Sequence, residues 1–243
     1  MKHYSNLYNN DVDIWFVNQD ILPIQASFFF KQLCKEEQKR ANAFYFEKDK
    51  RHFIASRYAL RQILGQYLQT EPSDLQFSYS KFEKPSLIDF DIHFNVSHSY
   101  GKALIAVAKN PVGIDIEWSL REVELKELAQ RFFSCNEAEQ FLKLEDSVMQ
   151  RYFFNIWTKK EAVIKAIGDG LSYPLDRFHV GIQADNDTLY FDDIEIEKKP
   201  WSLKTVHLPQ ADYVAALAVK GDINLVKLKS FEFLNKTNAL FNP

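Results

Sequence analysis

Two carboxylates alternate with apolar residues in the segment VGIDIE at 112–117. Successive side chains of a β-strand point to opposite faces, so the apolar residues share one face and Asp115 and Glu117 share the other. The strand rise separates the two carboxylates by roughly 6.5–7 Å, and like charges repel there unless a cation lies between them. The segment is therefore either an exposed sheet edge or a pair of oxygen ligands for a hard cation such as Mg²⁺.

A third carboxylate, Glu161, lies in a helix that the apolar periodicity predicts over 151–167. At 100° per residue, Glu161 falls in the same sector as Phe153 and Trp157. A core-facing carboxylate is costly unless it is paired or metal-bound. Lys165 follows at i+4 and is a neighbour on the helix surface. The two residues form either an ordinary salt bridge or a third metal ligand with a cation beside it.

Small polar residues surround a histidine in the segment FNVSHS at 94–99. They are a candidate pocket for an oxyanion or a phosphate, although a lone histidine is more often structural. Ser97 and His98 are adjacent, but no GxSxG elbow supports a serine nucleophile. Lys84 is a further candidate, because Pro85 restricts its backbone to an extended conformation.

These residues need a scaffold of mixed helices and strands. Apolar runs predict strands at 12–17, 103–108, 112–117 and several times within about 178–233, and helical periodicity predicts helices at 27–46, 51–68, 122–131, 135–145 and 151–167. The segment ALIAVAKNPVGIDI (103–116) resembles YVAALAVKGDINLV (213–226), which is consistent with a duplicated α+β unit. On the helix 51–68, Arg51, Arg57 and Arg61 form either a solvated face or an anion-binding wall.

The composition is that of a folded protein, with 46% hydrophobic and 26% charged residues among 243. A net charge of −3 argues against a dedicated nucleic-acid-binding domain. The first residues lack the apolar run of a signal peptide, and no stretch approaches the roughly 20 apolar residues of a membrane span. Cys34 and Cys135 are expected to be reduced thiols in a cytoplasmic protein.

Five segments, taken together, carry a family resemblance. They are KP (84–85), FNVSHS (94–99), VGIDIE (112–117), RFFSCNE (131–137) and WTKKEAVIKAIGDGL (157–171), with a looser match over 39–61. In this order and spacing they resemble the 4′-phosphopantetheinyl transferases, specifically the long two-lobed, surfactin-synthetase-activating type. Two positions depart from the family's pattern: Glu83 stands where a glycine is usual, and Trp118 stands where a small or basic residue is usual.

The resemblance implies an α+β fold of two similar lobes related by a pseudo-two-fold axis, with coenzyme A in the cleft between them. We expect an N-terminal lobe at 1–118 and a C-terminal lobe at 119–243. Such enzymes move the phosphopantetheine arm of coenzyme A to a serine of an apo acyl or peptidyl carrier protein and release adenosine 3′,5′-bisphosphate. The expected partners include neither nucleic acid nor membrane, and the expected state is a cytoplasmic monomer. The pathway served would be secondary metabolite, fatty acid or lysine biosynthesis.

The resemblance also implies roles for individual residues. The ligands of Mg²⁺ would be Asp115, Glu117 and Glu161. Lys165 would lie by the pyrophosphate of coenzyme A, and Glu161 would assist removal of the serine proton. The residues expected to hold the coenzyme A phosphates are Arg40, Arg51, Lys84, Ser97, His98 and Lys165.

Two other functions use the same residues. The first is a Mg²⁺-dependent nuclease or phosphatase, against which the negative net charge and the lack of a basic stripe argue. The second is a non-catalytic module that binds carrier proteins, derived from a decayed transferase. The presence of Asp115, Glu117, Glu161 and Lys165 argues against such decay.

Overall fold

The computed structural model describes residues 7–168, 173–183, 187–192 and 200–233. Its helices and strands, in chain order, are β1 (Asp11–Asn18), α1 (Pro23–Phe30), α2 (Lys35–Asn42), α3 (Glu47–Leu68), β2 (Phe77–Tyr79), β3 (Pro85–Leu87), β4 (His93–Ser99), β5 (Lys102–Ala108), β6 (Val112–Trp118), α4 (Leu125–Phe132), α5 (Cys135–Leu142), α6 (Asp146–Ile167), β7 (Phe178–Val180), β8 (Leu189–Phe191), β9 (Trp201–Thr205), β10 (Tyr213–Lys220) and β11 (Leu225–Phe231). Short 3₁₀ helices lie at Pro72–Asp74 and Leu175–Arg177.

The same arrangement of strands and helices occurs twice. Among the described strands, one sheet has the order β11-β1-β5-β4 and another has the order β6-β10-β9, so β1-β5-β4 corresponds to β6-β10-β9. Each series contains two short helices followed by a long one, and α3 and α6 both have 22 residues. The predicted fold class, two similar α+β lobes, is confirmed.

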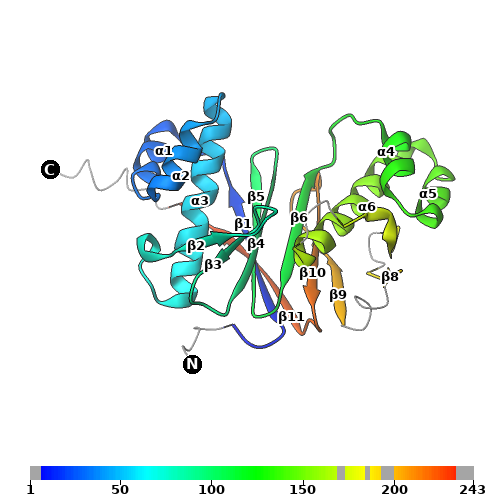
Figure 1. Cartoon of the computed structure of the whole chain (residues 1–243). Helices are drawn as coiled ribbons and strands as arrows, with labels where there is room; N and C mark the ends of the chain where they lie inside the picture. The colour runs from blue at the N-terminus through cyan, green and yellow to red at the C-terminus, as the bar shows by residue number, and fades with distance from the viewer. Residues whose placement is uncertain (1–6, 169–172, 184–186, 193–199, 234–243) are drawn as a thin grey trace.

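The layers run helix, sheet, sheet, helix. Figure 1 shows α1–α3 on one outer side, α4–α6 on the other, and the sheets between them. Alternate apolar residues of β1, β5, β6 and β10, among them Ile14, Leu104, Ile114 and Leu217, are fully buried between the two sheets. The opposite faces of these strands pack on α3 in the first lobe and on α6 in the second. A continuous apolar core therefore joins the two lobes.

The lobes exchange strands. The chain passes from β5 in one sheet to β6 in the other through the turn at Asn110 and Pro111, and β6 pairs with β10. It returns from β10 to β11, which pairs in parallel with β1. Thus β6 precedes the expected boundary at 118 yet lies in the second sheet, and β11 lies in the first. The division of the chain into an N-terminal lobe at 1–118 and a C-terminal lobe at 119–243 stays a prediction.

Most predicted elements are present, but the helix expected over 27–46 is two helices. The chain leaves α1 after Phe30 and re-enters a helix at Lys35. The side chain of Glu37 accepts a hydrogen bond from the Cys34 backbone N–H at 3.2 Å, which caps the start of α2. The helix expected to begin at residue 51 begins at Glu47, so residues 47–51 are the first part of α3. Two predicted regions lie partly outside the described residues: the motif at 157–171, in its last three residues, and the segment 178–233, in which several strands are expected.

Among the described helices, none combines the length and the apolar character that crossing a bilayer requires.

Candidate active site

Strand β6 places its two carboxylates on the face that meets α6. Val112, Ile114 and Ile116 point into the core between the sheets. Asp115, on the opposite face, is only 4% exposed, and Glu117 is half-buried. The predicted alternation is confirmed, while the alternative of an exposed sheet edge is wrong for Asp115.

Asp115 is held by residues from both lobes. Its Oδ1 accepts a hydrogen bond from Ser97 Oγ at 2.7 Å, across from β4, and one from Lys165 Nζ at 2.6 Å, from α6. Lys165 Nζ also donates to Ser97 Oγ at 3.0 Å. The other oxygen, Oδ2, is buried and has no hydrogen-bond partner among the described residues. A charged acceptor is therefore free beside an ammonium group.

A polar seam joins β4 to β6, formed by Asn95, Ser97 and Ser99. Their side-chain oxygens accept hydrogen bonds from the backbone N–H groups of the residues opposite, Ile114 at 2.9 Å, Ile116 at 3.3 Å and Trp118 at 3.0 Å. The hydrogen-bonded residues are spaced by two on both strands, so the side chains on one face of β4 bind the backbone of β6 in register. The seam fixes where the carboxylates of the second sheet lie relative to the first lobe.

Glu117 lies next along the same face. Its Oε2 accepts a hydrogen bond from Ser99 Oγ at 2.8 Å and its Oε1 accepts one from Arg121 at 3.0 Å. Burial raises the pKa of Glu117, and the negative charge of Asp115 raises it further. Ser99 orients this carboxylate, a role that was not predicted for it although it lies in the 94–99 motif. The signal was available, since Ser99 shares the two-residue alternation of Ser97.

Glu161 faces the same site from α6, as its position in the apolar sector predicted. Burial and the charge of Asp115 raise the pKa of Glu161 to about 7, and Lys165 only partly offsets this. Among the described residues, the acidic partner of Lys165 is Asp115 rather than Glu161. The ordinary i, i+4 salt bridge, one of the two predicted possibilities, is not formed. Glu161 is thus a carboxyl poised to gain or lose a proton near neutral pH.

The donor chemistry of this site fits a hard divalent cation, although no ready-made centre is present. Within the described parts of the chain, no three His, Cys, Asp or Glu side chains are grouped closely enough to hold a metal ion. Asp115 Oδ2 is nevertheless free among the described residues, and burial, followed by the charge of Asp115, raises the pKa values of Glu117 and Glu161. A cation with oxygen preference would offset both effects on the charged carboxylates.

Of the expected phosphate-binding residues, Ser97 and Lys165 lie at the carboxylates, as described. His98 is exposed on β4, and the pKa of its ring is lowered by desolvation and then by the nearby charges of Lys165 and His52. Arg51 is half-buried in the early part of α3. The guanidinium of Arg40, on α2, lies over two aromatic rings, those of Phe53 at 5.7 Å and Tyr79 at 5.5 Å.

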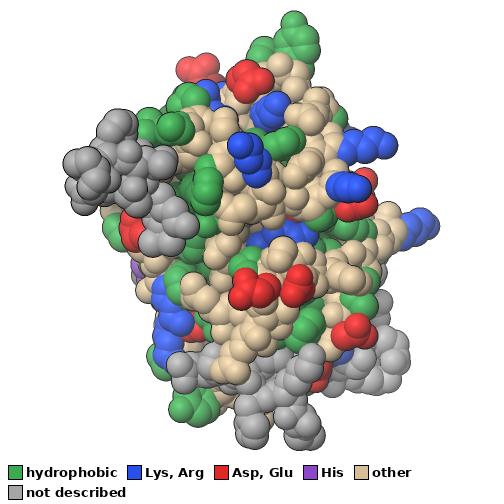
Figure 2. All heavy atoms as spheres, turned by 90° about the vertical axis from the view of Figure 1, so that its left-hand side faces the viewer, with side chains coloured by type: hydrophobic (Ala, Val, Ile, Leu, Met, Phe, Trp, Pro, Cys, Tyr) green, Lys and Arg blue, Asp and Glu red, His purple; other side chains and the backbone are tan. Residues whose placement is uncertain are grey.

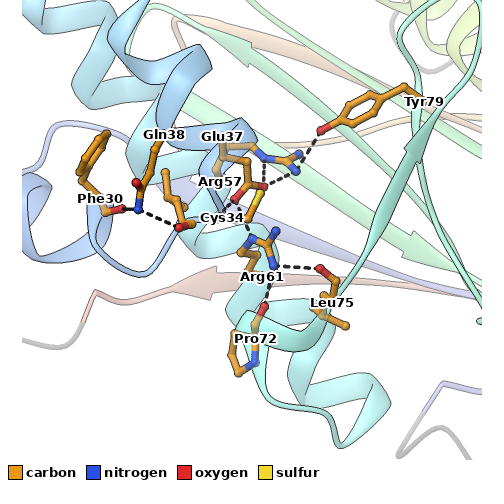
Figure 3. Close-up of polar contacts among 10 residues, drawn as sticks. Phe30, Cys34, Glu37, Gln38, Arg57, Arg61, Pro72, Leu75 and Tyr79 are labelled. Carbon is orange, nitrogen blue, oxygen red and sulfur yellow. Dashed lines mark hydrogen bonds and ion pairs between the residues drawn. The ribbon is translucent and has the colours of Figure 1, made fainter.

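Two of the three α3 arginines, Arg57 and Arg61, form neither an anion-binding wall nor a solvated face. Arg61 is 2% exposed, and its Nε donates to Glu37 Oε2 at 2.7 Å while its Nη1 donates to the carbonyls of Pro72 and Leu75. Arg57 donates to the other oxygen of the same carboxylate at 2.8 Å (Figure 3). Both arginines are thus occupied by a buried acid that ties α2 to α3.

The two departures from the family pattern have local structural counterparts. Glu83 has a φ of 59°, in the left-handed region that favours glycine, so the backbone keeps the conformation expected of a glycine. Trp118 stacks on Tyr100 with ring centroids 4.1 Å apart and an interplanar angle of 10°. Lys48 Nζ, from α3, lies 5.2 Å from the centroid of the same Tyr100 ring.

A serine, a histidine and an aspartate also line up in the second lobe, but as a structural group. His179 contacts Ser134 Oγ at 2.8 Å through Nδ1 and Asp192 at 3.1 Å through Nε2. Ser134 is 2% exposed and caps α5, with its hydroxyl donating to Glu137 at 2.8 Å. A buried hydroxyl whose proton is given to a carboxylate cannot act as the nucleophile of a hydrolase.

Comparison with known proteins matches this architecture along most of the chain. Residues 111–218 match the model of the 4′-phosphopantetheinyl transferase superfamily, and residues 22–110 match the model described as 4′-phosphopantetheinyl transferase, N-terminal. The sequence is 36% identical to 4′-phosphopantetheinyl transferase HetI of Nostoc sp. over 88% of this chain and 90% of that protein. It is 31% identical to 4′-phosphopantetheinyl transferase Sfp of Bacillus subtilis over 80% of this chain and 85% of that protein.

Among solved structures, the holo-[acyl-carrier-protein] synthase of Thermotoga maritima matches with a TM-score of 0.36 and 19% identity, over 46% of this chain and 63% of that one.

Proposed function

The chain belongs to the 4′-phosphopantetheinyl transferase superfamily, and on that basis we propose that its Asp115–Lys165 site transfers the phosphopantetheine arm of coenzyme A to a serine of an apo acyl or peptidyl carrier protein. The serine oxygen forms a bond to the phosphorus nearest the pantetheine. The bond from that phosphorus to the bridging oxygen breaks, and adenosine 3′,5′-bisphosphate leaves.

One observation carries the assignment of the site: Lys165 Nζ lies 2.6 Å from Asp115 and 3.0 Å from Ser97, which are contributed by different sheets. An ammonium group between a carboxylate and a hydroxyl at a junction of two lobes can donate a further hydrogen bond to a phosphate oxygen. Charge-assisted hydrogen bonds to phosphate are strong, and here they would neutralise the pyrophosphate as the leaving group departs.

Glu161 is the residue we assign to the serine proton. In the metal-free protein its pKa is about 7, near the working pH of a general base, and a bound cation would lower it and so favour the carboxylate that can take a proton. The proton of the attacking hydroxyl would pass to a carboxylate oxygen of Glu161. Ser97 and Ser99 hold Asp115 and Glu117 in place during the reaction, since each serine hydroxyl donates to one of these carboxylates.

We further propose that Asp115, Glu117 and Glu161 hold Mg²⁺. The support is the free Oδ2 of Asp115 and the raised pKa values of Glu117 and Glu161, which burial and the charge of Asp115 cause and a bound cation would offset. When bound, the ion would act as a Lewis acid on the pyrophosphate oxygens. His98, Arg40 and Arg51 remain proposals as contacts for the other phosphates of coenzyme A.

A monomer is proposed as the active state because both lobes, and therefore all of these residues, come from one chain. A cytoplasmic location is proposed as well, and the two cysteines, which form no disulfide, are compatible with it. Neither proposal depends on which carrier protein is the substrate.

The test is incubation of the purified protein with coenzyme A, Mg²⁺ and a panel of apo carrier proteins, read by intact mass. A mass increase of one phosphopantetheine arm on the carrier serine, with release of adenosine 3′,5′-bisphosphate, is expected. Binding of the carrier without any mass increase would favour the non-catalytic module. Cleavage of DNA or RNA in place of transfer would favour the nuclease. On the outer side of the first lobe, Figure 2 shows Lys and Arg side chains in several separate groups and not in one stripe.

A further inference from the structure

The ammonium group of Lys84 reaches from the first lobe into the second and ends on backbone carbonyls. Lys84 Nζ donates to the carbonyl oxygens of Lys165 and Ala166, at the end of α6, with the Ala166 contact at 3.4 Å. It also donates to the carbonyl of Val112, the first residue of β6, at 3.4 Å. One side chain therefore contacts both elements that carry the groups of the active site.

These contacts use the whole donor capacity of the lysine. An ammonium group has three N–H donors, and three carbonyl oxygens face it here. The carbonyls of the last helical turn have no partner within the helix, and they carry the negative end of the helix dipole. Burial lowers the pKa of Lys84 to about 8, as expected for a cation removed from water. A group in this position is poorly placed to bind a phosphate of coenzyme A.

The hairpin that carries Lys84 fixes the backbone from which the lysine side chain extends. Phe77 pairs with Leu87 across β2 and β3, and the turn between the strands is closed by a hydrogen bond from the Ser80 N–H to the Lys84 carbonyl at 3.0 Å. The side-chain oxygen of Ser80 accepts a second bond, from the Lys84 N–H, at 3.2 Å. The left-handed φ of 59° at Glu83 turns the chain immediately before the lysine.

We propose that Lys84 is a positioning residue, which fastens the last turn of α6 to the start of β6 and thereby holds Lys165 and Glu161 against Asp115. The path is short: Lys84 binds the carbonyl of Lys165, and the side chain of that same Lys165 binds Asp115. This inference rests on the proposed function for its catalytic consequence. It replaces the expectation that Lys84 binds a coenzyme A phosphate.

Two variants separate the two roles. Lys84→Met keeps the length of the side chain but removes its charge and donors. Lys84→Arg keeps the positive charge, and a guanidinium binds phosphate at least as well as an ammonium. The planar guanidinium is larger, so it does not fit among three carbonyls arranged around a compact ammonium. Lys81→Met, in the exposed turn of the same hairpin, is the matched control.

Three quantities are measured on the full chain: kcat and KM for coenzyme A with a carrier protein, the Kd for adenosine 3′,5′-bisphosphate by calorimetry, and amide hydrogen exchange over residues 163–168. For Lys84→Met we expect kcat to fall by about 10–100-fold, as for a small misplacement of reacting groups. The Kd for the bisphosphate should stay within about threefold of wild type, because no phosphate contact is lost. Exchange at the end of α6 should accelerate, and Lys84→Arg should not restore kcat.

A phosphate-binding role predicts the opposite pattern. The Kd for the bisphosphate would rise about tenfold or more in Lys84→Met, Lys84→Arg would restore it, and exchange in α6 would be unchanged; that result would overturn the proposal. If the wild-type protein transfers nothing, the proposed function fails, while the exchange and bisphosphate measurements still decide whether Lys84 fastens α6. A circular dichroism melt identifies a variant that does not fold, and exchange in Lys81→Met sets the baseline.

Discussion

Gly113 and Ala162 bring β6 and α6 into backbone contact. A β-carbon built on Gly113 would lie 2.1 Å from the carbonyl oxygen of Ala162, far inside van der Waals contact. Gly113 lies on the same face of β6 as Asp115, and Ala162 is the residue after Glu161 on α6. The closeness of the helix to the strand at this point therefore sets the distance between the carboxylates of the site. The role of Gly113 could not be predicted from the sequence, because a glycine in a strand carries no sign of what approaches it.

Gly113→Ala should push α6 away from β6. The added methyl meets backbone atoms that cannot rotate aside, so we expect a loss of unfolding free energy of about 1–3 kcal/mol and a fall in kcat of about 100-fold. Denaturant unfolding and steady-state kinetics measure the two effects. Gly65→Ala, in α3, is the control, since a β-carbon there would lie 2.8 Å from the carbonyl oxygen of Thr70. It should lower stability while kcat stays near wild type, and equal losses of kcat in both variants would contradict this interpretation.

Ser99→Ala should weaken the site through Glu117. The substitution removes the hydrogen bond to Glu117 Oε2 and leaves the Trp118 N–H without its acceptor. We expect the Mg²⁺ concentration for half-maximal rate to rise about tenfold, the usual effect of losing a group that orients a metal ligand. Titration of the rate with Mg²⁺ measures this. Ser78→Ala, which removes an exposed serine pair with Ser86 in the β2–β3 hairpin, should leave the titration unchanged.

The sequence predicted those features of the site that depend on side-chain periodicity. Alternation along 112–117 placed Asp115 and Glu117 on one face, and helical spacing placed Glu161 toward the core. The echo between 103–116 and 213–226 corresponds to β5–β6 and β10–β11, the two places where the chain crosses between the sheets. Periodicity is a pattern among neighbouring residues, so it can be recognised without knowledge of the tertiary structure.

The roles of the basic residues could not be predicted in this way. Arg61 and Lys160 occupy the same position in α3 and α6, and each is buried against an acid at the third residue of a short helix, Glu37 at 2.7 Å and Glu137 at 2.8 Å. Lys160, like Lys84, also donates to backbone carbonyls. A carbonyl acceptor is present in every residue and leaves no trace in the sequence. Buried lysines of this kind are therefore indistinguishable from surface ones until the fold is known.

Glu161 should make the stability of the metal-free protein depend on pH. Its pKa is about 7 in the folded state and 4.5 as a free group. Because the folded value is the higher one, its stabilising contribution is complete below about pH 4.5 and is lost as the pH rises through 7. We expect a loss of about 2 kcal/mol of unfolding free energy after discounting for partial exposure. Denaturant unfolding in EDTA at several pH values, compared with Glu161→Gln, isolates this group; parallel curves for the two proteins would show that Glu161 does not titrate in this range.

Glu83→Gly should stabilise the fold. A non-glycine residue with a φ of 59° carries a conformational cost of about 1 kcal/mol, which glycine removes. Glycine also gives the unfolded chain more freedom, which offsets part of the gain. The net expectation is an increase of roughly 0.5 kcal/mol in unfolding free energy, with kcat unchanged. Denaturant unfolding measures it, and Lys81→Gly in the same turn, where no left-handed φ is present, should be destabilising. Destabilisation by Glu83→Gly would mean that the Glu83 side chain itself is needed.

Glu161→Gln separates the two roles proposed for this residue. The amide keeps an oxygen that can face a metal ion but cannot accept a proton. If Glu161 is a ligand alone, excess Mg²⁺ should restore most of the rate. If it also takes the serine proton, excess Mg²⁺ should not rescue a deficit of about 10²–10⁴, the usual size of a general-base contribution. We expect the second outcome, because burial and the charge of Asp115 place the pKa of Glu161 near the working pH.

Asp115→Asn is the control for that experiment, since Asp115 is already engaged by Ser97 and Lys165 and has no role as a base. Its rate should recover substantially with added Mg²⁺, whereas the rate of Glu161→Gln should not. The pH profile adds a second criterion: the limb of kcat/KM that Glu161 produces should vanish in Glu161→Gln and persist in Asp115→Asn. Near-normal turnover of Glu161→Gln at ordinary Mg²⁺ would exclude both roles and leave Glu161 as a carboxyl that is merely buried beside the reacting groups.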